Sequence, residues 1–254
     1  MKHLLSRECR PLLTSLVLGR TLFAFDFDGT LAPIVDHPET ACLRPETTAA
    51  LAKLALLHPC VVISGRSRSD VLNRLKGLPL AAVVGNHGAE FEGMPIRNPL
   101  HNLALIDAWK SALSSHVCRY PGVWVEDKGL SLAVHYRQSN YKDQARKAVM
   151  SLAGGFEGAD VFGGKEVVNV VPAGAADKGH ALAVERRRLQ CDEAVFFGDD
   201  ENDEEAFGLV KTVGVRIGRK DESRASYYLE SQLEIDECLK CVVDTFNIAT
   251  GQHL

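Results

Sequence analysis

A short apolar run that ends in two carboxylates is the strongest constraint on how this chain can fold. Residues 22–25 are all apolar, and Asp26, Asp28 and Gly29 follow directly. A run of this length that stops at a polar, glycine-containing turn predicts a strand buried on both faces, as in a parallel sheet. Because ligands of open α/β sheets bind at the carboxyl ends of such strands, this turn is the first candidate site.

The spacing of the two carboxylates indicates a cation site and a nucleophile. Asp26 leaves the strand and Asp28 approaches from the turn, so two negative charges share a small volume. A hard, oxygen-preferring cation such as Mg²⁺ between them would relieve the repulsion. A carboxylate can also attack phosphorus and form an aspartyl-phosphate. Taken alone, however, such a pattern is more often an acidic strand-to-helix turn that binds nothing.

Strand and helix patterns alternate on both sides of a central segment. Pro45 opens a predicted helix that Pro59 closes, and short apolar runs predict further strands at residues 60–63, 81–84, 194–197 and 213–217. We expect the run 213–217 to be the last core strand, followed by a closing helix over residues 231–246. This alternation predicts an α/β fold whose core is a doubly wound, Rossmann-like parallel sheet.

Polar residues follow two of these strands. Ser64, Gly65 and Arg66 come directly after the second strand of the chain, and a hydroxyl with a guanidinium at a strand end suits a phosphate group. Asn86 and His87 lie in a glycine-flanked loop after the third strand. There His87 is either a ligand contact or a solvated side chain.

A second acidic strand end lies in the last third of the chain. Asp199, Asp200 and Asp203 follow the predicted strand 194–197, and the helix before that strand begins at Lys178, which places an ammonium at a helix N-terminus. Each motif on its own has a simpler interpretation, as a surface lysine and as an acidic helix start. Two acidic strand ends in one doubly wound sheet nevertheless favour a shared cation site.

The middle of the chain has a different pattern. Two predicted helices, at residues 105–113 and 141–153, accompany antiparallel strands that turn at residues 127–129 and at Gly163-Gly164. One face of the first strand pair is unusually polar for a core, so it meets either water or a polar ligand; its residues include Trp124, Glu126, Ser131, His135 and Arg137. We predict an inserted, smaller α/β cap domain over residues 101–172, with the core formed by residues 1–100 and 173–254.

Composition argues against several classes of partner. The 254-residue chain has a formal net charge of −4, so it lacks the basic excess of a nucleic-acid-binding protein, and no stretch approaches the roughly 20 apolar residues of a membrane span. Seven cysteines without a disulfide spacing predict reduced thiols and a cytoplasmic location. The lone C-x-x-C at Cys238 and Cys241 is better explained by an amphipathic helix than by zinc. The short apolar run at residues 12–18 lacks a cleavage site, so no signal peptide is expected, and the composition is compatible with a monomer.

The order of these motifs resembles the haloacid dehalogenase superfamily of phosphohydrolases. Four motifs match it along nearly the whole chain: D-F-D-G-T-L at 26–31, S-G-R at 64–66, K-G at 178–179 and G-D-D-x-x-D at 198–203. Within the superfamily, the segments 85–90, 126–131, 135–137 and 198–204 are similar to the trehalose-6-phosphate phosphatase family. The resemblance implies Mg²⁺-dependent hydrolysis of trehalose 6-phosphate to trehalose and phosphate through an aspartyl-phosphate.

Carried over residue by residue, the resemblance implies a role for each matched side chain. Asp26 would be the nucleophile and Asp28 the acid/base, while Ser64 and Lys178 would hold the phosphate. Asp199 would bind Mg²⁺ together with Asp26 and the Asp28 carbonyl, supported by Asp200 and Asp203. Glu126 and Lys128 would grip the sugar, and the full set of expected substrate contacts is Thr30, Gly65, Arg66, Asn86, His87, Glu126, Lys128 and Asn169.

Three positions depart from the family pattern. Asn169 and Val171 stand where the family commonly has glutamate and then arginine or lysine, and Asn202 replaces a common threonine. The third carboxylate of the cap is therefore absent, although an amide can still hydrogen-bond a hydroxyl. Three alternatives stay open: a phosphatase of another sugar phosphate, such as sucrose phosphate or mannosyl-phosphoglycerate, a phosphosugar-binding module without turnover, and a phosphomutase.

Overall fold

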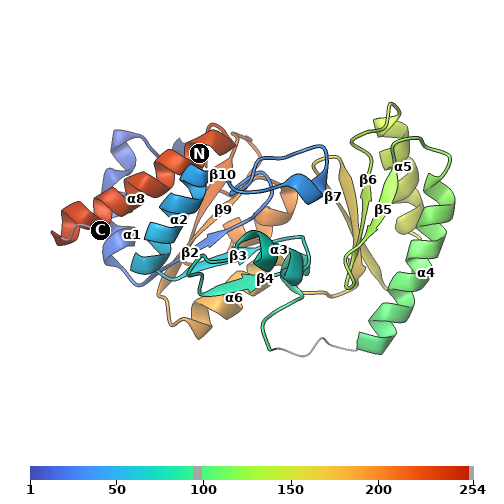
Figure 1. Ribbon diagram of the computed structural model, residues 1–254, viewed down its shortest axis with the longest axis horizontal. Helices are drawn as coiled ribbons and strands as arrows, with labels where there is room; N and C mark the ends of the chain where they lie inside the picture. Colours follow the sequence, from blue (N-terminus) through green and yellow to red (C-terminus); the bar gives the residue numbers. More distant parts are fainter. Residues whose placement is uncertain (94–98, 252–254) are drawn as a thin grey trace.

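Two sheets of different kinds lie side by side in the computed structural model, which describes residues 1–93 and 99–251 (Figure 1). All strand pairs in the seven-stranded sheet are parallel, and all pairs in the four-stranded sheet are antiparallel. The predicted α/β fold with a doubly wound parallel core and a smaller second layer is confirmed. Within the described residues, no helix is both long enough and apolar enough to cross a membrane.

The parallel sheet reverses its winding direction between two central strands. Its order is β1 (Lys2–His3), β11 (Tyr227–Leu229), β10 (Thr212–Ile217), β9 (Glu193–Gly198), β2 (Thr21–Phe25), β3 (Cys60–Ile63) and β4 (Ala82–Val84). The chain runs outward from β2 to β4, and later outward in the other direction from β9 to β11. Because β2 and β9 meet at this reversal, their carboxyl ends flank the crevice where such sheets bind ligands.

Helices cover both faces of the parallel sheet because β2 is apolar on both sides. Phe23 and Phe25 pack with one layer of helices, whereas Leu22 and Ala24 pack with the other. The first layer contains α1 (Arg10–Leu18), α2 (Pro45–Leu57), α3 (Arg68–Arg74) and α8 (Ile235–Thr250). The second contains α6 (Lys178–Arg188) and α7 (Glu204–Phe207).

The antiparallel sheet lies between its own two helices and the carboxyl edge of the parallel sheet (Figure 1). Its order is β5 (Trp124–Asp127), β6 (Leu132–His135), β8 (Val167–Pro172) and β7 (Ala159–Gly164). Helices α4 (Pro99–Val117) and α5 (Lys142–Ala153) pack on its outer face. The opposite, polar face is thereby turned toward the two acidic strand ends.

Two predicted details of the strands are wrong. Gly163 and Gly164 end β7, and the turn is formed by Lys165 and Glu166, the latter with φ 64°. A Cβ at Gly164 would lie 2.8 Å from both Asp200 Oδ2 and Val167 Cγ1, so this glycine lies where the hairpin closely approaches the acidic loop. In addition, β10 is not the last strand, because β11 and β1 extend the sheet; both are too short to leave an apolar run in the sequence.

The boundaries of helices differ slightly from prediction. The closing helix α8 begins at Ile235, after a 3₁₀ turn over Gln232–Glu234, and continues to Thr250. Helix α4 begins at Pro99, two residues before the expected start of the cap at 101. Residues 94–98 and 252–254 of the predicted core lie outside the described part of the chain.

Stacking of two buried phenylalanines links the central strands. The rings of Phe25 in β2 and Phe197 in β9 lie 5.0 Å apart with an interplanar angle of 12°. We expect Phe197→Ala to lower the free energy of unfolding by about 3–5 kcal/mol, because it leaves a cavity between the strands that carry the acidic turns. Urea denaturation measures this loss. Val210→Ala is the control, since Val210 is 78% exposed and its truncation should change stability by less than about 0.5 kcal/mol.

Candidate active site

Most of the residues predicted for the site line one pocket between the two sheets. Those lining it are Asp26, Asp28, Gly65, Arg66, His87, Glu126, Lys128, Asn169, Lys178, Asp199 and Asp200. Thr30, Ser64, Asn86 and Asp203 are buried but do not belong to the lining residues among those described. The sequence therefore predicted the location of the pocket, while some of the residues lie behind its wall.

A buried ammonium joins the two acidic strand ends. Lys178, the first residue of α6, lies 2.9 Å from Asp26 Oδ1 and 2.7 Å from Asp203 Oδ1. Burial opposes the charge on Lys178, but the two carboxylates outweigh it and raise the pKa of the ammonium above its ordinary value. Burial raises the pKa of Asp26 well above its usual range, and Lys178 counteracts this effect. Lys178 is thus a fixed positive charge beside the predicted nucleophile.

The loop after β9 is held from both sides. Asp203 Oδ2 accepts the backbone N–H groups of Asp199 and Asp200, each at 2.9 Å. Arg216 of β10 donates to the carbonyls of the same two residues, at 2.9 and 3.2 Å. Arg216 was missed in the sequence, although a single arginine within the buried run Thr212–Ile217 was a usable signal. These contacts fix the direction of the Asp199 carboxylate.

Three carboxylates of this region fit a hard cation. Asp26, Asp199 and Asp203 each offer an oxygen, and these oxygens all lie within 4.8 Å of one another. Asp199 Oδ1 is buried and has no hydrogen-bond partner among the described residues. Burial raises the pKa of Asp199 to about 6, although Lys165 opposes this. Gly29, with φ 80°, leaves the space for this carboxylate that a Cβ would fill. An all-oxygen, anionic donor set of this kind suits Mg²⁺.

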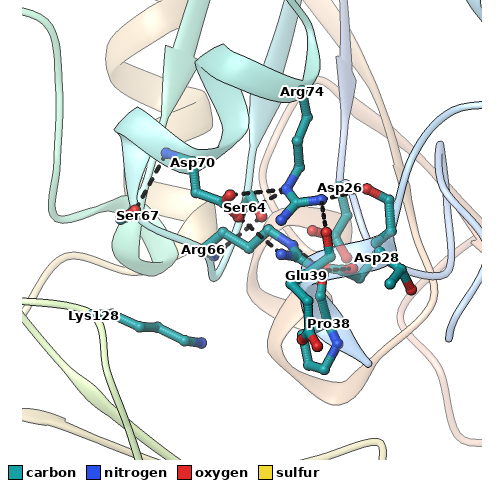
Figure 2. Close-up of polar contacts among 12 residues, drawn as sticks. Asp26, Asp28, Pro38, Glu39, Ser64, Arg66, Ser67, Asp70, Arg74 and Lys128 are labelled. Carbon is teal, nitrogen blue, oxygen red and sulfur yellow. Dashed lines mark hydrogen bonds and ion pairs between the residues drawn. The ribbon is translucent and has the colours of Figure 1, made fainter. Parts of the chain in front are cut away.

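The second carboxylate of the first turn points away from that cluster. Arg66 donates from Nε and Nη2 to the two oxygens of Asp28, both at 2.7 Å (Figure 2). The same guanidinium donates to Asp70 Oδ2 and to the carbonyl of Pro38, both at 2.8 Å. Arg74 Nε also donates to Asp70, at 2.9 Å from each of the two carboxylate oxygens. Since four of the five N–H groups of Arg66 are already used, it fixes Asp28 and retains little capacity for a phosphate.

The opposite wall of the pocket comes from the antiparallel sheet. Glu126 Oε2 lies 2.7 Å from His135 Nε2 and 4.0 Å from Lys128 Nζ. The indole of Trp124 stacks on His135 with ring centroids 4.3 Å apart. Burial would raise the pKa of Glu126, but the hydrogen bond from His135 and the charge of Lys128 hold it below its ordinary value. The wall therefore combines a carboxylate, an ammonium and an aromatic face, a set that suits a polyhydroxylated ligand.

One residue of this wall reaches the acidic loop. Lys165, in the turn between β7 and β8, pairs with Asp199 Oδ2, and its backbone N–H donates to Asp200 Oδ2 at 3.1 Å. This contact was not predicted, because the turn was expected at Gly163 and Gly164. It closes the pocket on the side of the carboxylate cluster.

A family model of the trehalose-phosphatases matches residues 24–232. The chain belongs to the trehalose-phosphatase family. The trehalose-phosphate phosphatase of Mycobacterium ulcerans (strain Agy99) is 34% identical over 239 residues, which cover 87% of this chain and 61% of that protein. That of Mycobacterium tuberculosis (strain ATCC 25618 / H37Rv) is 35% identical over 222 residues, or 81% of this chain and 55% of that protein. The chain thus spans about three fifths of the length of these curated trehalose-phosphatase relatives.

The fold of the trehalose-phosphatase family is also found in a solved structure. The C-terminal domain of the C. albicans trehalose-6-phosphate phosphatase superposes with a TM-score of 0.80 at 20% identity and covers 92% of this chain and 97% of that one. At this identity the likeness shows a shared fold. It accounts for both the parallel sheet and the antiparallel layer of this trehalose-phosphatase family member.

His87 is an unusual member of the site. It is 6% exposed, it has a left-handed backbone with φ 57°, and neither ring nitrogen has a hydrogen-bond partner among the described residues. A Cβ at Gly65 would collide with its ring, so that glycine leaves room for it. Burial, together with the charges of Lys128 and Lys178, lowers the pKa of His87 well below its ordinary 6.5; the amide of Asn169 nearby opposes this, but without the geometry of a hydrogen bond. His87 is therefore an uncharged side chain that faces the pocket.

This pKa gives His87 a measurable effect on stability. When folding lowers the pKa of a group, the neutral form of that group adds to the free energy of unfolding at any pH above its unfolded-state pKa. For His87 this stabilisation is lost as the pH falls from about 6.5 through the pKa of the folded state. His87→Asn, which tolerates the left-handed backbone, should therefore lose less stability than the wild type between about pH 7.5 and 5.5. Urea unfolding at both pH values measures this difference. Parallel losses in the two proteins would show that His87 does not titrate in this way.

Proposed function

We propose that the chain is a Mg²⁺-dependent phosphatase that converts trehalose 6-phosphate to trehalose and phosphate through an aspartyl-phosphate on Asp26. The observation that carries this proposal is the position of Asp26, at the end of β2, paired with Lys178 and within the carboxylate cluster. Membership of the trehalose-phosphatase family and the names of the curated relatives support the substrate. The polar wall opposite Asp26 supports a sugar phosphate.

The core residues account for the chemistry at phosphorus. An oxygen of Asp26 attacks the phosphorus, the bond from phosphorus to the sugar oxygen breaks, and the phosphoryl group is left on Asp26. Lys178 at the start of α6 and Ser64 at the end of β3 would stabilise the charge that spreads over the transferring oxygens. Asp26 and Asp199, with the Asp28 carbonyl, would hold Mg²⁺, and the bound cation would supply further charge neutralisation there.

Asp28 is proposed as the acid and base of the two steps. It would give its proton to the departing sugar oxygen and then take one from the water that attacks the phosphorus of the aspartyl-phosphate. This second step releases phosphate and restores both aspartates. Two hydrogen bonds from Arg66 hold the carboxylate of Asp28 at the edge of the pocket. Asp200 and Asp203 would support the cation ligands through the acidic loop.

The antiparallel layer is proposed to recognise the sugar and exclude water. We assign residues 101–172 to this cap and residues 1–100 and 173–254 to the core. Glu126 and Lys128 would bind hydroxyl groups, with Gly65, His87 and Asn169 completing the substrate contacts, whereas Thr30, which does not line the pocket, would act from behind them. The cytoplasm fits the seven cysteines, all of which are free.

Asn169 keeps a second substrate class open. It lies in β8 opposite Ala133 and lines the pocket where the family commonly has a carboxylate. A panel of sugar phosphates, including trehalose 6-phosphate, sucrose phosphate and mannosyl-phosphoglycerate, therefore tests the proposal. Preferred phosphate release from trehalose 6-phosphate is expected. Preference for another member would reassign the substrate, and tight binding without release would make the chain a binding module.

The nucleophile is tested by removing its charge. Asp26→Asn should reduce phosphate release to background while the circular dichroism spectrum stays native, because an amide of the same shape cannot attack phosphorus. Asp221→Asn is the control, since that carboxylate is 91% exposed in a surface turn. Appreciable turnover by a folded Asp26→Asn protein would refute the covalent mechanism.

The cation is tested by titration as well as by activity. Chelator should abolish phosphate release and Mg²⁺ should restore it. Asp199→Asn should weaken Mg²⁺ binding in calorimetry by at least roughly tenfold, because the loss of one anionic ligand is worth more than a neutral hydrogen bond. Glu185→Gln, at a buried carboxylate that pairs with Arg188 away from the pocket, should bind Mg²⁺ as the wild type does. Turnover in chelator would contradict the proposal.

A further inference from the structure

Asn86 joins the two sheets. It is 2% exposed and adopts a left-handed backbone with φ 47°, directly before His87, which does the same. Its backbone N–H donates to the carbonyl of Arg66 at 2.7 Å, and its side-chain amide donates to Glu90 Oε2 at 2.9 Å. On the core side, Asn86 is therefore fixed at both its main chain and its side chain.

The rest of the Asn86 amide contacts the turn between β5 and β6. Oδ1 accepts the buried hydroxyl of Ser131 at 2.8 Å, and Nδ2 donates to the carbonyl of Lys128 at 3.3 Å. Lys128 and Ser131 are themselves joined by a backbone hydrogen bond of 3.0 Å. The core thus holds this turn at its two ends, through one side chain.

These contacts leave Asn86 unable to serve as a substrate ligand in the way its sequence position suggests. Both amide hydrogens are used, one by Glu90 and one by Lys128, and Asn86 is not among the described residues that line the pocket. An amide is nevertheless required here, because the position must donate to two oxygens and accept from a hydroxyl. Aspartate would supply no donor and would place a second carboxylate beside Glu90.

Lys128 depends on this support. Its side chain is 10% exposed, and Glu126, at 4.0 Å, is the carboxylate that reaches it in the described chain. Burial lowers the pKa of the Lys128 ammonium, and Glu126 offsets this only in part. No hydrogen bond from Nζ to another described residue orients the ammonium, so its position in the pocket is set mainly by its main chain.

We propose that Asn86 is a positioning residue for sugar recognition, which acts by holding the Lys128 carbonyl and the Ser131 hydroxyl and so aims the Lys128 ammonium at the hydroxyl groups of the substrate. This role rests on the proposed function, since it assumes a sugar phosphate in the pocket. Asn86 is then not a substrate contact itself but the residue that positions one, Lys128. The side chain of Asn86 bonds to Glu90, Lys128 and Ser131, none of which is proposed to act at phosphorus.

Ser131→Ala tests the role with the smallest change. It removes the hydroxyl from Asn86 Oδ1 without altering the strained backbone of Asn86. Because a buried acceptor is left unpaired, kcat/KM for trehalose 6-phosphate should fall by roughly tenfold, mostly through a higher KM. Turnover of 4-nitrophenyl phosphate, which is too small to reach Lys128, should change less than about twofold. Asn86→Asp should show the same selectivity with a larger loss. Ser139→Ala, at another buried serine of the cap whose hydroxyl accepts from the Tyr141 N–H, should leave both substrates unaffected.

A double-mutant cycle separates positioning from general support. If Asn86 acts through Lys128, Ser131→Ala should cost less than about twofold once Lys128→Ala is already present. The inference is overturned if kcat/KM falls equally for both substrates, or if the losses of the two single variants add in the double variant. Thermal unfolding confirms that each variant is folded. The cycle uses whichever sugar phosphate of the panel the wild type hydrolyses best. A wild type that hydrolyses none overturns the proposed function itself, and this role with it.

Discussion

The rest of the site depends on the ion pairs that the Lys178 ammonium makes with Asp26 and Asp203. Asp26 and Asp203 come from different strand ends, and both are buried where a carboxylate without compensation would be costly. One cation between them allows the ends of β2 and β9 to meet. Asp203 in turn holds the backbone of the acidic loop, so the same ammonium that pairs with Asp26 also orders the loop that carries Asp199.

The site is divided between a rigid half and an adaptable half. In the core, charges are fixed by short contacts within the parallel sheet and its loops, as the fork of Arg66 on Asp28 shows. In the antiparallel layer, Lys128 has no comparable partner among residues 1–93 and 99–251 and is placed by main-chain contacts. The residues proposed for the chemistry at phosphorus thus lie on the rigid half, and those proposed to recognise the sugar lie on the other half.

The parts predicted from the sequence were those with local causes. The prediction was correct for buried strands such as Cys60–Ile63 and for the helix that starts at Asp177 and Lys178. Apolar runs and helix caps depend only on residues that are adjacent in the sequence. The short strands β1 and β11 were missed because they have no apolar run of their own. Pairings between distant residues, such as Asn86 with Ser131 or Lys165 with Asp199, depend on how the two sheets dock, which no local pattern encodes.

Gly164 shows how this architecture limits evolutionary change outside the reacting groups. The residue has no side chain, and a Cβ there would lie 2.8 Å from both the Asp200 carboxylate and Val167 Cγ1, so a substitution would require these side chains to shift. Drift in the antiparallel layer is therefore expected to be uneven. The exposed faces of its outer helices can exchange residues more readily, whereas the hairpin tips that touch the core are constrained by the shape of their neighbour. A survey of natural variants in this layer would trace the contact line between the two sheets.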